Sequence, residues 1–116
     1  MNALGGATLS HVLILYVSTP SVDAANHIAE LLIDKKLAAC VNVMPSSTAI
    51  YRWAGKVERA TEALMFVKTT NAKSSAARAL IAQEHEYDVP CILALPTLPN
   101  QSNPGYLDWV QQETTG

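Results

Sequence analysis

The alternation of short, β-branched apolar runs with segments of helical periodicity is the feature that most constrains how this chain folds. Four segments have the composition of strands, and amphipathic helical segments lie between them in the order β-α-β-β-α-β. A further short helix is predicted near the end of the chain. The predicted strands are 11–18, 40–53, 63–70 and 91–95, and the predicted helices are 22–36, 72–85 and one that begins at 104.

Local signals support these helices and the turn at the centre of the chain. Ser21, Asn71 and Asn103 each precede a predicted helix and are suited to the N-cap position. Pro104 follows Asn103 and has the fixed φ that favours the first helical position. Between the two central strands, Ala54-Gly55 is predicted to be the tip of a hairpin.

Two β-α-β units joined by a central hairpin predict an α+β, ferredoxin-like βαββαβ sandwich with an extra C-terminal helix. We expect residues 1–10 to be an N-terminal extension and residues 11–113 to form a single domain. Both central helices lie on the same face of such a sheet, which leaves the other face uncovered. An uncovered apolar face favours self-association, and the aromatic pair Tyr51 and Trp53 on the hairpin is suited to the interface.

Composition excludes several classes of protein. The chain has 8 Lys and Arg against 10 Asp and Glu, a net charge of −2, which argues against a general nucleic-acid partner. No apolar run approaches the roughly 18 residues that span a bilayer, so no membrane association is expected. No basic start precedes the first apolar run, as a signal peptide would need. Cys40 and Cys91 are expected to be free thiols, and we predict a cytoplasmic location.

Polar side chains that could carry chemistry gather at the end of the second predicted helix. Segment 83–88 holds one imidazole, His85, together with three carboxylates, and such groups bind divalent first-row metals. The segment is therefore a candidate metal site centred on His85. The alternative is a solvated helix end in which His85 is only a local hydrogen-bond partner.

Two further features have open interpretations. Lys68 lies inside an apolar strand, where it is either an edge charge or a buried cation paired with Glu62 or Asp88. Tyr51 and Trp53 share one sheet face and form either interface packing or a platform for a ligand. The sequence lacks the common catalytic and phosphate-binding motifs. We therefore expect no enzyme, although His85 with Asp88 is a conceivable acid–base pair.

Five motifs in order resemble those of the CutA divalent-cation tolerance proteins. They are KLAACVN at 36–42, IYRWAGKVE at 50–58, KT at 68–69, HEYDVP at 85–90 and YLDW at 106–109. The chain departs from the family pattern at Glu86, Asp88 and Cys91, where Pro, Glu and Glu are usual. Val17 and Glu84 stand where some members have a Cys and a second His, so His85 is what remains of a copper-binding set.

The resemblance implies a homotrimer related in shape to the PII signalling proteins, with clefts between its subunits. It implies a role in the response to metal ions, copper especially, or in sensing a small ligand, without a tightly bound cofactor. The alternatives are a PII-like regulatory trimer that binds a small metabolite and a structural trimeric scaffold. The metal ligand implied is His85, and the cleft residues implied are Asn42, Tyr51, Trp53, Glu62, Lys68, Tyr87 and Asp88.

Overall fold

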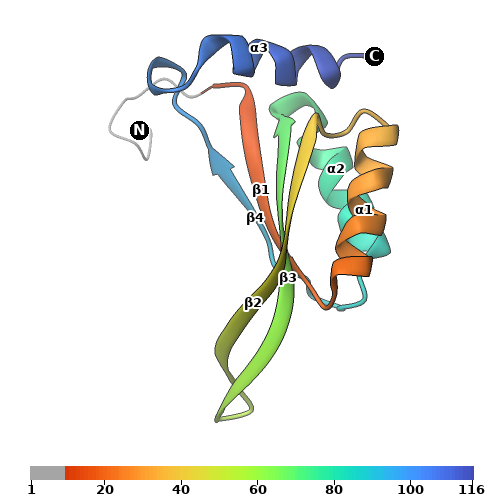
Figure 1. Ribbon diagram of the computed structural model, residues 1–116, viewed down its shortest axis with the longest axis vertical. Helices are drawn as coiled ribbons and strands as arrows, with labels where there is room; N and C mark the ends of the chain where they lie inside the picture. Colours follow the sequence, from red (N-terminus) through yellow and green to blue (C-terminus); the bar gives the residue numbers. More distant parts are fainter. Residues whose placement is uncertain (1–9) are drawn as a thin grey trace.

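The elements of this chain follow the predicted order in a computed structural model that describes residues 10–116 (Figure 1). The predicted extension at 1–10 lies outside the described residues except for Ser10. The strands are β1 (Val12–Thr19), β2 (Cys40–Trp53), β3 (Lys56–Thr70) and β4 (Ile92–Pro96). The helices are α1 (Val22–Asp34), α2 (Asn71–Glu84), the short turn η1 (Pro99–Gln101) and α3 (Pro104–Glu113).

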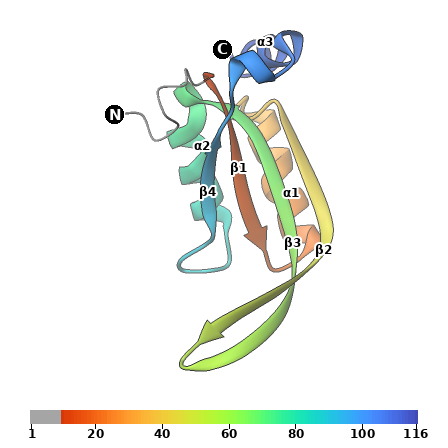
Figure 2. The ribbon, with the colours of Figure 1, turned by 90° about the vertical axis from the view of Figure 1, so that its left-hand side faces the viewer.

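The four strands form one sheet in the order β2-β3-β1-β4. Each neighbouring pair is antiparallel, with β1 and β3 at the centre and β2 and β4 at the edges. Helices α1 and α2 cover one face of the sheet, whereas α3 lies across one end of it (Figure 1 and Figure 2). This architecture confirms the predicted ferredoxin-like α+β fold with an additional C-terminal helix.

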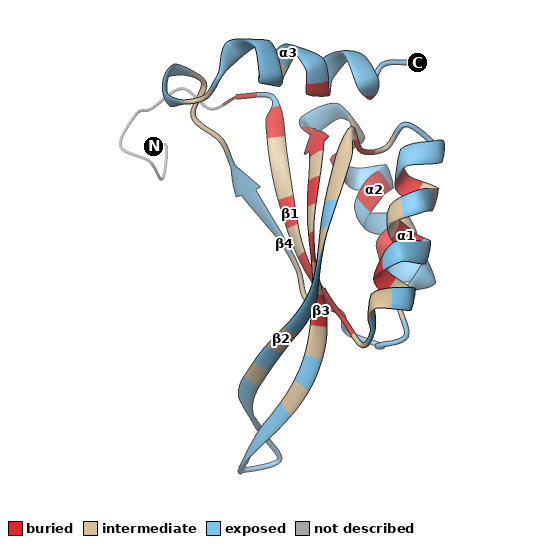
Figure 3. Cartoon of the chain, in the orientation of Figure 1, coloured by how far each residue is buried: buried red, intermediate tan, exposed pale blue. Residues whose placement is uncertain are grey.

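The hydrophobic core lies between the sheet and helices α1 and α2. Leu15 and Val17 on β1 lie opposite Val67 and Met65 on β3, and all four are fully buried (Figure 3). Burial of a side chain of this kind contributes about 1.5–3 kcal/mol, so this layer holds the helices on the sheet. The buried helix residues that pack against it are Ala25, Ile28, Leu32, Ala77 and Ile81.

The opposite face of the sheet carries a second set of apolar side chains, which alternate with those of the core. We call this surface of the sheet the outer face, because it faces away from α1 and α2 (Figure 2). Tyr16 and Phe66 meet there edge to face, with ring centroids 5.6 Å apart. Leu93 remains 57% exposed and Met44 49% exposed. The apolar residues of the outer face are Ile14, Tyr16, Met44, Leu64, Phe66, Leu93 and Leu95.

Strands β2 and β3 continue beyond the rest of the sheet as a two-stranded hairpin (Figure 1). β1 reaches only to Thr19, opposite Ala63, so residues 47–53 and 56–62 pair with each other alone. A shift of register between residues 44 and 47 lies where the hairpin leaves the sheet. Ala54 and Gly55 have φ values of 49° and 80°, the left-handed conformation of a tight hairpin turn, which confirms the predicted tip.

The predicted strand boundaries differ from the structure most strongly at β3. This strand begins at Lys56 rather than Ala63, because its ladder to β2 runs to the hairpin tip, where Lys56 lies opposite Trp53. Strands β1 and β4 each begin and end one residue later than predicted.

The helix ends also required correction. Helix α1 stops at Asp34 instead of residue 36, because Lys36 adopts a φ of 57° that ends the helical path. Asn71 is the first residue of α2 and not its N-cap, which is Thr70. The Asn71 N–H donates to the carbonyl of His11 at 2.8 Å, so the residue just before β1 satisfies this donor.

Cys40 and Cys91 are both free thiols, as predicted. Cys40 begins β2 and Cys91 immediately precedes β4, and these two strands are the opposite edges of the sheet. Their positions therefore keep the two sulfur atoms from forming a bond within one chain.

Candidate functional site

Three polar residues from different segments meet near the base of the hairpin: His85, Glu62 and Tyr87. We call them the His85 cluster. His85 is the C-cap of α2, Tyr87 lies in the connection from α2 to β4, and Glu62 lies on β3. The Tyr87 hydroxyl donates to Glu62 Oε2 at 3.3 Å. The rings of His85 and Tyr87 have centroids 4.9 Å apart. The structure thus brings these three predicted site residues together.

Both ring nitrogens of His85 are engaged within the chain. Nδ1 accepts the backbone N–H of Tyr87 at 3.1 Å, and Nε2 lies 2.7 Å from the carbonyl oxygen of Ser18 at the end of β1. Because Nδ1 accepts, this pattern assigns the proton to Nε2, which donates to Ser18. A neutral imidazole therefore ties the α2–β4 connection to the sheet. A metal ion can reach the Nδ1 lone pair only when the Tyr87 N–H moves away.

The phenol of Tyr87 has a perturbed acidity. Burial raises its pKa above the ordinary value, and the negative charge of Glu62 and the hydrogen bond to it raise the pKa further. The phenolate charge of Tyr51 and the carboxylate of Glu86 act in the same direction. The environment therefore favours the neutral phenol and disfavours the phenolate.

We expect one phenol of the folded protein to ionise late in an alkaline titration. The raised pKa means that the folded chain holds this proton more tightly than the unfolded chain. The resulting stabilisation is complete below about pH 10 and is lost as the pH rises through the folded pKa. Phenolate absorbance of wild type should show a late component that Tyr87→Phe removes, that Tyr106→Phe retains and that Glu62→Gln shifts to lower pH. A late component unchanged in Tyr87→Phe would contradict the assignment.

The remaining predicted site residues are not part of the His85 cluster. Asn42 is exposed on edge strand β2, with Oδ1 4.0 Å from the sulfur of Cys40. Trp53 is 71% exposed at the end of the hairpin, and Asp88 is exposed in the α2–β4 connection.

Of the two alternatives for Lys68, the pairing with Glu62 or Asp88 does not occur among residues 10–116. Glu62 and Lys68 share a face of β3 but are six residues apart, which separates them by about 20 Å at about 3.3 Å per residue. Lys68 instead places Nζ over the ring of Tyr106 on α3, 5.4 Å from its centroid. Lys68 therefore belongs to a different part of the molecule from the His85 cluster.

Two residues that matter here were absent from the predicted site. Ser18 contributes only its backbone carbonyl, which no side-chain pattern can indicate. Tyr106 lies in the YLDW motif of the terminal helix. Its aromatic side chain in a short helix was the feature that could have indicated a contact with the sheet. Asn103 was predicted correctly as the cap of this helix, because its Oδ1 accepts the N–H groups of Gly105 and Tyr106.

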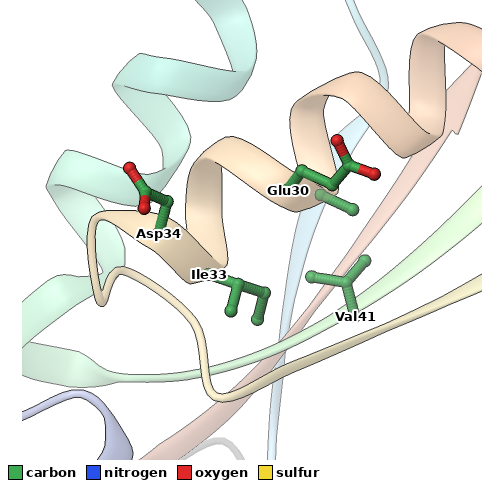
Figure 4. Close-up of a pocket in the computed structure, with 5 residues that line it drawn as sticks. Glu30, Ile33, Asp34 and Val41 are labelled. Carbon is green, nitrogen blue, oxygen red and sulfur yellow. The ribbon is translucent and has the colours of Figure 1, made fainter.

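A shallow groove of about 350 Å³ runs between α1 and β2 (Figure 4). Ile33 and Val41 project into the space between helix and strand, and Ala29 completes the apolar floor. Glu30 and Asp34 supply the polar groups of this groove. The groove lies on the helical side of the sheet and contains none of the predicted site residues.

The metal-binding potential of a single protomer is limited. Within residues 10–116, three or more His, Cys, Asp or Glu side chains do not converge anywhere as a closed metal site requires. The His85 cluster offers one imidazole nitrogen with the carboxylate of Glu62 nearby. A metal bound there would complete its coordination with solvent or with groups from another copy.

Comparison with known proteins identifies the family. A family profile described as "CutA1 divalent ion tolerance protein" matches residues 13–113. The Divalent-cation tolerance protein CutA of Thermus thermophilus is 40% identical over 101 residues, which cover 87% of this chain and 96% of the relative. The Protein CutA homolog of Xenopus laevis is 45% identical over 95 residues and 82% of this chain. This chain belongs to the CutA divalent-cation tolerance family.

Solved structures agree with this assignment. The periplasmic divalent cation tolerance protein CutA from Archaeoglobus fulgidus superposes with a TM-score of 0.83 at 36% identity, covering 90% of this chain and 99% of that one. Membership of the family confirms the prediction of a divalent-cation tolerance protein. The match spans only 62% of the Xenopus relative's length.

Family membership does not assign a cellular compartment. The Archaeoglobus relative is described as periplasmic, so a cytoplasmic location for this chain stays a prediction. Of the helices in the described part of the chain, none combines the length and apolar character needed to cross a membrane.

Proposed function

We propose that this CutA-family chain acts as a homotrimer that binds a divalent cation, copper in particular, or a small ligand at clefts between its subunits. The observation that carries the proposal is the outer face, a continuous apolar surface on the side of the sheet opposite α1 and α2. Exposed apolar surface of this extent marks an interaction site in a folded protein. A second and a third copy of the same surface are its simplest cover.

The hairpin supports the same assembly. Tyr51 and Trp53 lie on one of its faces, and Ile50 and Val57 lie on the other, with exposed fractions from 44% to 71%. An isolated two-stranded hairpin is marginally stable in water, so this one needs a further surface along its length. A hairpin that projects from one copy across its neighbour would also bring the His85 cluster close to a subunit boundary.

Light scattering tests the assembly directly. We expect a mass of about three times the 12.5 kDa chain at micromolar concentration. A mass equal to that of one chain would contradict the proposal.

The proposed metal contact uses Nδ1 of His85. Only the exposed connection after α2 must move to free this nitrogen, whereas Nε2 is held by a carbonyl of the sheet. Glu84 and Glu86 flank His85 in sequence and offer carboxylate oxygens. Cu²⁺ should bind more tightly than Mn²⁺ or Mg²⁺, because nitrogen ligands follow that order.

Calorimetric titration with Cu²⁺ tests this contact. His85→Gln should weaken binding about tenfold or more, while its amide can still donate to the Ser18 carbonyl. His11→Gln is the matched control, because His11 is exposed and precedes β1, at the opposite end of that strand from the Ser18 carbonyl that His85 contacts. Equal affinity of His85→Gln and wild type would contradict a role for this imidazole.

A further inference from the structure

A second candidate site lies under α3, away from the His85 cluster. A cavity of about 230 Å³ opens between the outer face of the sheet, the segment that follows β4 and the start of α3. Its walls are mainly apolar and include Val12, Ile14 and Leu107, with the ring of Tyr106 beside them. Lys68 also lines the cavity and supplies its positive charge.

Lys68 lacks an anionic partner in the described part of the chain. The single ion pair within 4.0 Å among residues 10–116 joins His27 to Glu84, so Lys68 has no carboxylate at that distance. Its side chain is half-buried, and its contact is the face of the Tyr106 ring. A cation–π contact offsets only part of the lost hydration of an ammonium group. The N–H donors of Lys68 thus remain available to an acceptor that enters the cavity.

The other polar groups of the cavity are already satisfied. The Thr97 hydroxyl donates to the carbonyl of Val12 at 2.8 Å, and the Ser102 hydroxyl donates to the carbonyl of Leu98 at 2.6 Å. The Asn103 side chain caps α3. A ligand therefore meets one cation and an apolar surface. This combination suits a molecule with one negative group and disfavours a multiply charged anion such as phosphate.

The start of α3 adds to the preference for negative charge. Asn103 and Tyr106, at the N-terminal end of this ten-residue helix, line the cavity. The N-terminal end of a helix carries partial positive charge, which favours a nearby anion. The volume of the cavity is below the range of about 300–1,000 Å³ that is usual for drug-sized ligands, so the ligand must be small.

We propose that the cavity between Lys68 and α3 binds a small organic monocarboxylate, with its carboxylate on Lys68 Nζ and its apolar body against Val12, Ile14 and Leu107. This site is distinct from the metal contact at His85; it shares Ile14 with the outer face, so in the proposed trimer it lies beside the subunit interface. The site would recognise its ligand by two features together, one positive charge and an apolar wall, because either contact alone gives weak binding in water.

The test titrates the full-length protein with benzoate and isovalerate, followed by calorimetry and by amide chemical shifts. Benzyl alcohol is the probe that has the apolar body without the charge. Inorganic phosphate is the probe that has negative charge without the apolar body. We expect both carboxylates to bind and to shift amides of β1 and α3, and both single-feature probes to bind at least about tenfold more weakly.

Variants at Lys68 make the test specific. Lys68→Met keeps the apolar stem and should lose about tenfold or more in benzoate affinity, whereas Lys68→Arg should stay within a few-fold of wild type. Lys56→Met, at an exposed position on the hairpin, is the matched control and should bind like wild type. Circular dichroism checks that each variant is folded. Undetectable binding of both carboxylates, equal affinity in Lys68→Met, or equal affinity for benzyl alcohol would each overturn the proposal.

Discussion

Leu93→Glu is expected to convert the assembled protein into a folded monomer. Leu93 lies on β4 opposite Tyr16 and is 57% exposed in one protomer, so a carboxylate there leaves the protomer's own core intact. In the proposed trimer the same position is covered by another copy, and an unpaired charge at such an interface costs several kcal/mol. The cost arises in every subunit. Light scattering should therefore report about one third of the wild-type mass.

Ile33→Glu is the matched control for this experiment. Ile33 is 43% exposed on α1, on the helical side of the sheet, and should accept a charge without loss of assembly. Circular dichroism verifies that both variants keep their secondary structure. A trimeric Leu93→Glu protein would exclude the outer face as the interface.

Leu15→Ala should destabilise the chain by about 2–5 kcal/mol, the range of large-to-small changes in a packed core. Leu15 is fully buried on central strand β1, opposite Val67, and helices α1 and α2 confine the space around it. The neighbours therefore cannot collapse freely into the cavity. The measurement is the free energy of unfolding from denaturant titration at a fixed chain concentration, since assembly adds to apparent stability.

The corresponding control removes an exposed apolar side chain of similar size. Ile33→Ala should change the free energy of unfolding by about 0.5 kcal/mol or less, because water already contacts this residue. Similar values for the two variants would mean that Leu15 is not part of the core described above.

The fold was largely predictable because the core segments have strong and distinct periodicities. The residues of β1, and those of β3 that pair with β1, are mostly apolar. Helices α1 and α2 have apolar residues at the spacing of one helical face. The prediction was weakest at residues 56–62, where Val57 is the single large apolar side chain and polar residues occupy both faces, so the segment shows no apolar alternation. Pairing with β2 extends the strand there, and pairing between distant segments is not a local property of sequence.

The candidate site was only partly predictable for a related reason. The clustering of His85 and Tyr87 was visible because the two residues are neighbours in sequence, and the family resemblance added Glu62. Lys68 was misplaced because its charge suggested a carboxylate partner, whereas its position along β3 directs it to the ring of Tyr106. A side chain's face can be predicted from strand periodicity, but its neighbours depend on which element covers that part of the sheet.

The overhang of the hairpin beyond β1 has a consequence for the order of folding. Residues 47–53 and 56–62 have no third strand in their own protomer, so their backbone hydrogen bonds are the least protected of the sheet. In separated chains the amide protons of this region should exchange with solvent far faster than those of β1. Docking of copies would slow that exchange, which makes the protection of the hairpin depend on protein concentration. Folding then has a unimolecular phase that forms the sheet and a later, concentration-dependent phase that completes the hairpin.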